Sequence, residues 1–198
     1  LGLWVPLRDP SFFNQFIAQA LSGIQSTLME SNYNLLVYSP TGKHGRAAIG
    51  QALQSRLTDG LIVINTRSCT TRDVNDTIVE LNRAGVRFSM MNSYYGRAEI
   101  DYVGVDDEIL GAAAARHLTN SGHRRIALLS GLSTLPAHIH LVKGLRKGLS
   151  EQGVDFDEEM IGCTRYDRSI AFSLLDEWFS SRRRKPTAIF AADEDRKS

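Results

Sequence analysis

Short apolar runs alternate with longer amphipathic stretches along the first half of the chain. Each run suits a buried strand, whereas each stretch carries apolar residues at the spacing of one helix face. The pattern therefore predicts four strands and three helices in this half. The runs lie at residues 3–5, 35–38, 61–64 and 88–91, and the stripes pass through Phe12, Phe13, Phe16, Ile17, Ala20, Leu21, Ile24 and Leu28, then Ile49, Leu53 and Leu57, then Val74, Ile78 and Leu81.

The predicted strands are apolar on both faces. In the run Leu61-Ile62-Val63-Ile64, no polar residue alternates with the apolar ones. Such strands are typical of parallel sheets, because helices cover both faces and leave neither to solvent. The fold class predicted from this pattern is doubly wound α/β.

A second series of strands and helices follows a polar, glycine-containing segment at residues 92–99. We place the junction near Asp106, which gives an N-terminal lobe of residues 1–106 and a C-terminal lobe of residues 107–198. The sequence stops at Ser198, where a further helix would be expected to begin, so we expect the C-terminal lobe to be incomplete. Strands are predicted at residues 102–105, 126–129, near 160 and at 188–191, and helices at 108–120, through Ile139, Val142, Leu145 and Leu149, and through Leu174, Leu175 and Trp178.

Composition narrows the class of protein. Lysine and arginine (23) nearly balance aspartate and glutamate (22), so the chain has no basic surplus for nucleic-acid binding. Cys69 and Cys163 lie far apart without the spacing of a zinc site, and no apolar run approaches the roughly 20 residues that cross a bilayer. These features predict a cytoplasmic protein without a metal, a cofactor or a membrane segment.

Three stretches of the chain together resemble one family. They are Val103-Gly-Val-Asp-Asp107, then Gly111-Ala-Ala-Ala-Ala-Arg-His-Leu118, then Ser121-Gly-His-Arg-Arg-Ile-Ala127. With weaker support from residues 3–6, 57–63 and 186–192, the chain resembles the lactose-repressor (LacI/GalR) family of transcription regulators. The resemblance implies a two-lobed fold of the periplasmic-binding-protein-like type I, and an effector held between the lobes.

The resemblance also implies the partners. In this family a helix-turn-helix on a preceding segment, absent from this sequence, binds DNA, and the first lobe supports a homodimer. The expected role is therefore a ligand-sensing domain that modulates DNA binding, and not an enzyme. Sequence motifs of hydrolases, zinc proteases and dinucleotide enzymes are missing. The alternative is a periplasmic solute-binding protein of a transport system with the same architecture.

Candidate effector-binding residues follow the predicted strands or begin the next element. Ligands of open α/β sheets bind beyond the carboxyl ends of the strands. Aromatic rings offer apolar faces to a sugar, and carboxylates and amides make directed hydrogen bonds to its hydroxyl groups. The predicted effector-binding residues are Phe12, Phe13, Asn92, Ser93, Tyr166, Asp167, Asp193 and Glu194.

Several of these residues also have structural interpretations. Phe12 fits the buried helix stripe, so we prefer Phe13 as a ligand contact. Asn92-Ser93 could instead cap a turn, and Tyr166-Asp167 could be surface residues ahead of a helix. Asp193-Glu194 stands where the family commonly has Asn-Asp, so both carboxylates remain candidates. For Asp106-Asp107 we favour helix capping.

One departure from the family affects the expected ligand. The family usually has an arginine three residues before a helical glycine, which here is Gly144, and that position is Leu141. A guanidinium supplies several directed donors that leucine lacks, so an ordinary monosaccharide is a less favoured effector. His138, His140 and Lys143 are the neighbouring side chains that could compensate. His138 and His140 are two residues apart, which makes them a poor metal pair on a helix.

Overall fold

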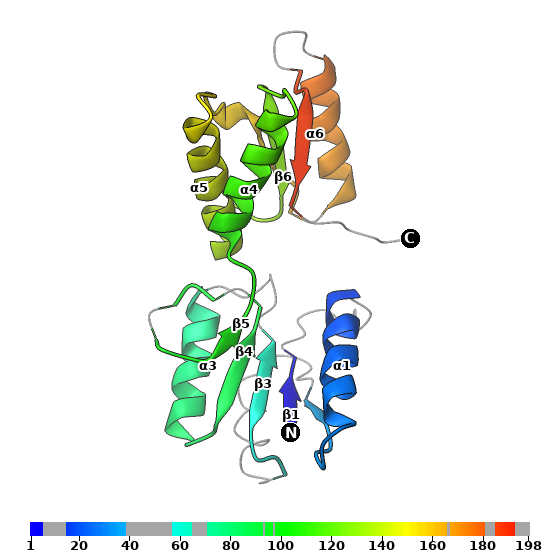
Figure 1. Cartoon of the computed structure of the whole chain (residues 1–198), viewed down its shortest axis with the longest axis vertical. Coiled ribbons are helices and arrows are strands. Elements are labelled where there is room, and N and C mark those ends of the chain that lie inside the picture. Colours follow the sequence, from blue (N-terminus) through cyan, green and yellow to red (C-terminus); the bar gives the residue numbers. More distant parts are fainter. Residues whose placement is uncertain are drawn as a thin grey trace. The chain divides into compact units, whose positions relative to one another are not determined.

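Two parallel sheets form the framework of the chain, one in each half (Figure 1). The computed structural model describes residues 1–5, 15–38, 57–64, 71–92, 94–96, 98–165, 167–180 and 185–192. The chain divides into two units, Leu1–Gly104 and Val105–Ser198, slightly before the junction predicted at residue 106. All the strand pairs among these described residues are parallel, which confirms the doubly wound α/β class.

The first sheet has the strand order β2-β1-β3-β4-β5. The strand predicted at residues 102–105 is its short last strand, paired with β4. The elements of this unit are β1 (Gly2–Trp4), α1 (Gln15–Leu28), β2 (Leu36–Tyr38), β3 (Leu61–Ile64), α3 (Thr71–Arg83), β4 (Phe88–Met91) and β5 (Tyr102–Val103).

Successive residues of β1 contribute to different apolar clusters. Leu3 packs in a cluster with Ile17 and Ile24 of α1. Trp4 packs in another cluster with Val74 and Ile78 of α3. Because side chains alternate between the faces of a strand, α1 and α3 cover opposite faces of the first sheet. The strands of this sheet therefore lack alternating polar residues for the predicted reason, which is that helices cover both faces.

Two predicted positions of the helix stripes are wrong. Phe16 is 39% exposed in the first turn of α1, while its neighbour Ile17 is buried. Leu57 is 69% exposed just before β3, where the second predicted helix stripe was to end. Helical spacing marks the apolar side of a helix, but the width that the sheet covers depends on packing. Ile49 and Leu53, the other members of that stripe, lie outside the described residues.

The second sheet has the strand order β7-β6-β8, with the longest strand in the centre. The predicted strand at residues 188–191 is confirmed at both ends, and the predicted helix at 108–120 starts one residue earlier. The elements are α4 (Asp107–Asn120), β6 (Ile126–Ser130), α5 (Pro136–Glu151), a 3-10 helix (Glu158–Met160), β7 (Ile161–Cys163), α6 (Arg168–Ser180) and β8 (Ala188–Ala191).

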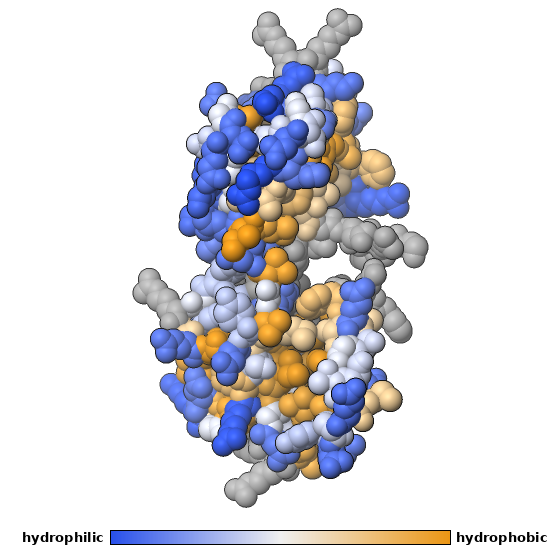
Figure 2. Space-filling model, viewed as in Figure 1, coloured by the Kyte–Doolittle hydropathy of each residue, from blue (hydrophilic) through white to orange (hydrophobic). Residues whose placement is uncertain are grey.

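The second sheet is also covered on both faces. Leu128 of β6 belongs to a buried cluster with Leu145 of α5 and Ala115 of α4. Its neighbour Ala127 packs instead with Met160 of the 3-10 helix and with Trp178 of α6. The helices α4 and α5 therefore share one face, and α6 covers the other. Figure 2 shows hydrophilic residues over much of the visible outer surface of α4 and α5.

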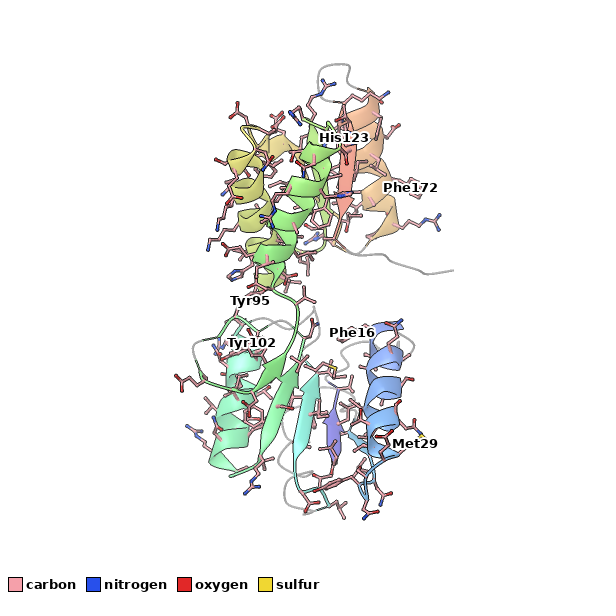
Figure 3. All side chains as sticks on the ribbon, viewed as in Figure 1. Phe16, Met29, Tyr95, Tyr102, His123 and Phe172 are labelled. Carbon is pink, nitrogen blue, oxygen red and sulfur yellow. The ribbon has the colours of Figure 1, made fainter. Side chains whose placement is uncertain are left out.

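Both ends of α4 are capped as predicted. The Oδ1 atom of Asp106 accepts hydrogen bonds from the N–H groups of Glu108 and Ile109, at 2.9 and 3.0 Å. At the other end, where His123 follows the helix (Figure 3), Gly122 has a φ of 89° and the N–H of His123 donates to the carbonyl of Leu118. This is the glycine-assisted helix stop expected from Ser121-Gly-His123. No described helix is long and apolar enough to cross a membrane.

Candidate functional site

The carboxyl ends of the second sheet's strands are tied together by backbone hydrogen bonds. The carbonyl of Ser130, at the end of β6, accepts both the N–H and the Oγ1 hydroxyl of Thr164, at 2.7 and 2.9 Å. The N–H of Arg165 donates to the carbonyl of Gly131, and that of Ala192 to the carbonyl of Leu129. The segments that follow all three strands therefore meet at one edge, where ligands bind in open α/β sheets.

A polar pair occupies this edge. Ser130 is only 4% exposed, and its Oγ lies 2.6 Å from Nδ1 of His138, in the first turn of α5. Burial lowers the pKa of the half-buried His138 from its usual 6.5, because desolvation penalises the imidazolium. The imidazole is thus neutral near neutral pH.

The Ser130–His138 pair is not arranged as a hydrolytic nucleophile. A nucleophile must reach its substrate, and the Ser130 side chain is almost completely covered. The pair is instead an anchored imidazole at the edge of the sheet. Sequence reasoning missed Ser130, and the only available signal was a polar residue directly after the apolar run at 126–129.

His140 and Lys143 face a different partner. The Nζ of Lys143 is 2.7 Å from Oε2 of Glu108 on α4, and Nδ1 of His140 is 3.9 Å from the same oxygen. The hydrogen bond from Lys143 holds the pKa of Glu108 below its ordinary value. Both side chains therefore lie toward α4. Of the three side chains proposed to compensate for the missing arginine, His138 contacts a polar group on the sheet, the hydroxyl of Ser130.

Leu141 lies in the core of the second unit. It is 3% exposed and belongs to the cluster that includes Ile126 and Leu145. The side chain at this position therefore packs between α4, α5 and the sheet, and it places no polar group at the edge of the sheet.

Asp167 caps α6. Its Oδ1 accepts from the backbone N–H of Ser169 at 2.7 Å and from the Ser169 hydroxyl at 2.5 Å, and more weakly from the N–H of Ile170 at 3.4 Å. The N–H of Asp167 in turn donates to the carbonyl of Thr164. These bonds give Asp167 the helix-start role that was the alternative interpretation of its sequence. Contact with an effector stays a prediction.

Asn92 follows β4 in the first unit. Its φ of 88° lies in the left-handed region, which glycine and asparagine tolerate best, and its N–H donates to the carbonyl of Val103 at 2.7 Å. The residue therefore has a backbone reason for being asparagine, in addition to its predicted contact. At the same edge of the sheet, Phe16 is a partly exposed aromatic residue at the start of α1 (Figure 3). The sequence had assigned it to the buried stripe.

The described residues include two members of the predicted effector site. Asn92 belongs to the first unit and Asp167 to the second, so the structure does not bring them together within one unit. The remaining predicted residues, Phe12, Phe13, Ser93, Tyr166, Asp193 and Glu194, lie outside the described residues.

Comparison with known proteins identifies the family. The family described as periplasmic binding proteins and sugar binding domain of the LacI family matches residues 1–196. The chain belongs to this family. The match spans both units and confirms the resemblance noted in the sequence.

Relatives in the family are transcription regulators. The arabinose metabolism transcriptional repressor of Halalkalibacterium halodurans is 27% identical over 189 residues, covering 93% of this chain and 50% of the relative. The HTH-type transcriptional regulator DegA of Bacillus subtilis is 26% identical over 198 residues, covering 96% and 56%. The chain thus spans about half the length of the curated relatives it matches.

Solved structures of the family have the same fold. The complex of the regulator CelR with cellobiose superimposes with a TM-score of 0.78 at 25% identity, covering 97% of this chain and 58% of that one. A LacI-family regulatory protein from Chloroflexus aggregans has a TM-score of 0.80 at 20% identity, covering 96% and 66%. The second likeness concerns the fold alone.

Proposed function

We propose that this chain is the ligand-sensing part of a cytoplasmic, bacterial LacI-type transcription regulator. A small polar effector, sugar-like or related, binds between the two units and modulates DNA binding by a separate N-terminal helix-turn-helix. The observation that carries the proposal is the match of the LacI sugar-binding family across residues 1–196. The regulators among the relatives and the cellobiose bound to CelR support it.

The mechanism follows from ligand linkage. An effector that binds one arrangement of the two units more tightly shifts the population toward that arrangement, and a DNA-binding segment attached to the first unit responds. We expect contacts with the effector from Asn92 in the first unit and from the surroundings of Ser130 in the second. The chain itself carries balanced charge, so DNA affinity resides in the helix-turn-helix.

A DNA-binding experiment separates this proposal from a periplasmic solute-binding protein. DNA selected from a random library by the full-length protein is titrated at low salt with that protein and with this chain alone. We expect sequence-specific binding by the full-length protein only, and a change in that binding when a sugar ligand is added. Full-length protein that binds sugar but selects no DNA sequence would favour the transport receptor.

Asn92 offers the sharpest test of the effector site in the first unit. Alanine at a φ of 88° strains the backbone, so Asn92→Ala mixes strain with loss of the side chain. Asn92→Gly removes the amide and keeps the conformation. We expect Asn92→Gly to weaken binding of whichever sugar binds the full-length protein roughly 5- to 150-fold, measured by calorimetry. Unchanged affinity in this variant would exclude Asn92 from the site.

The same proposal includes a homodimer. Closed two-fold dimers are the commonest soluble homo-oligomers, and one operator with two half-sites suits such a dimer. Light scattering on the full-length protein should give twice the monomer mass at micromolar concentration. A constant monomer mass up to near-millimolar concentration would contradict it.

A further inference from the structure

The start of α5 carries three nitrogen-bearing side chains, and their surroundings separate them. Lys143 and His140 lie beside Glu108 of α4, where the carboxylate neutralises the ammonium group. His138 instead reaches β6, through the 2.6 Å contact between Nδ1 and Oγ of Ser130. One imidazole is thereby placed at the carboxyl edge of the second sheet.

The ring of His138 is anchored at one nitrogen. Within the described part of the chain, the contact with Ser130 is the one hydrogen bond that its side chain makes. The ring is only partly buried, so Nε2 is the nitrogen left for another partner. In one tautomer Nδ1 accepts a hydrogen bond from the Ser130 hydroxyl, and Nε2–H is then a donor. In the other tautomer Nδ1–H donates to Ser130, and Nε2 is then an acceptor. Either tautomer offers a single uncharged hydrogen-bonding group.

We propose that Nε2 of His138 is an effector-binding atom of the second unit, and that its partner is a neutral hydroxyl group of the effector and not a carboxylate or phosphate. Ser130 acts as its positioning residue, fixing the ring through Nδ1. The inference rests on the proposed function, because it requires an effector at this edge.

The charges around this edge favour a neutral ligand. Burial disfavours the charged form of the His138 imidazole, and the apolar Leu141 supplies no cation at the position where the family usually has an arginine. On the connection from β7 to α6, Asp167 supplies a carboxylate at the start of α6. Arg165 is an exposed cation of the same connection, and Arg168 follows at the start of α6. A sugar hydroxyl requires no such charge.

Two variants of His138 distinguish ligand contact from a structural role. Asparagine places its amide near the position of Nδ1, so His138→Asn retains a partner for Ser130 and removes Nε2. Glutamine reaches the position of Nε2 and gives up the Ser130 contact. A ligand contact predicts that His138→Asn loses affinity while His138→Gln retains part of it. A purely structural role predicts the reverse order, visible as a change in the unfolding midpoint.

The experiment uses the full-length protein and calorimetry with cellobiose, L-arabinose, D-glucose, glucuronate and a hexose phosphate. We expect at least one neutral sugar to bind, both anions to bind at least tenfold more weakly, and His138→Asn to lower the neutral-sugar affinity roughly 5- to 150-fold. Arg165→Gln is the matched control and should leave that affinity unchanged.

The contrary outcomes are distinct. Unchanged neutral-sugar affinity in a folded His138→Asn protein would overturn the role of Nε2 and leave the sensing function intact. An anion bound more tightly than its neutral parent, with the affinity lost in Arg165→Gln, would overturn the neutral-ligand assignment alone. Failure of the wild-type protein to bind any of the five sugars would overturn this inference together with the sugar-like effector of the proposed function.

Discussion

Gly144 of α5 lies directly against the backbone of Glu108 in α4. A Cβ at position 144 would come within 2.7 Å of the carbonyl carbon of Glu108, closer than real Cβ atoms approach backbone. Gly148, one turn later, is similarly close to the carbonyl oxygen of Ala112. The two helices are therefore in backbone contact along one side, and this contact fixes the position of the first turn of α5, which carries His138.

Substitution at Gly144 should destabilise the second unit. Gly144→Ala forces two rigid backbones apart, and we expect a loss of about 1–3 kcal/mol in the free energy of unfolding. Gly23→Ala is the matched control, since Gly23 lies on the exposed side of α1 with nothing within 4 Å of a Cβ. It should gain about 0.5–1 kcal/mol from helix propensity. Urea denaturation of both variants measures the difference, and effects of the same sign would contradict the close helix contact.

The fold was accessible from the sequence because its signals are local. The strand at residues 188–191 is a contiguous apolar run, and the start of α4 is marked by a capping aspartate, Asp106. The errors came from packing. Whether Phe16 or Ile17 faces the sheet depends on the rotation of α1 against its neighbours, and helical spacing alone does not determine that angle.

The site was less accessible, because its contacts join residues on different elements. Nothing in the sequence pairs Ser130 with His138, since the contact depends on how α5 returns over the end of β6. The positive φ of Asn92 likewise accompanies a hydrogen bond to Val103, on the neighbouring strand, which the sequence does not reveal. Strand-end placement could identify which edge to inspect, and tertiary structure was needed to show which side chains meet there.

Leu141 should behave as a core residue. Leu141→Ala removes a buried side chain from the cluster between α4, α5 and β6, and we expect a loss of about 2–5 kcal/mol in the free energy of unfolding. Ile139, two residues earlier on the same helix, is 53% exposed, and Ile139→Ala should change stability by less than about 0.5 kcal/mol. Thermal or urea unfolding compares the two. Similar costs at both positions would mean that Leu141 does not lie in the core.

The Glu108–Lys143 pair predicts a dependence of stability on acid pH. The folded-state pKa of Glu108 lies below its ordinary 4.5 because Lys143 donates to the carboxylate. The unfolded chain therefore binds a proton first as the pH falls, and the stability present above pH 4.5 is lost below it. Lys143→Met should reduce this loss. Urea denaturation on both sides of that pH measures it, and the same acid dependence in wild type and variant would contradict the assignment.

His138 predicts a second pH dependence, in a separate and milder range. Its folded-state pKa is lowered from 6.5 by burial, so the folded protein resists protonation that the unfolded chain accepts. Above 6.5 both states carry a neutral ring and the group has no effect on stability. As the pH falls through 6.5, the unfolded state gains the proton first, so stability decreases until the folded state is protonated too. His138→Gln cannot titrate and removes this contribution.

Urea denaturation between about pH 8 and pH 5.5 should therefore show the wild type losing stability more steeply than the variant, because only the wild type carries the buried imidazole. Parallel curves for the two proteins would show that the ring is solvated like that of a surface histidine, and would remove the physical basis for a neutral group at the edge of the second sheet.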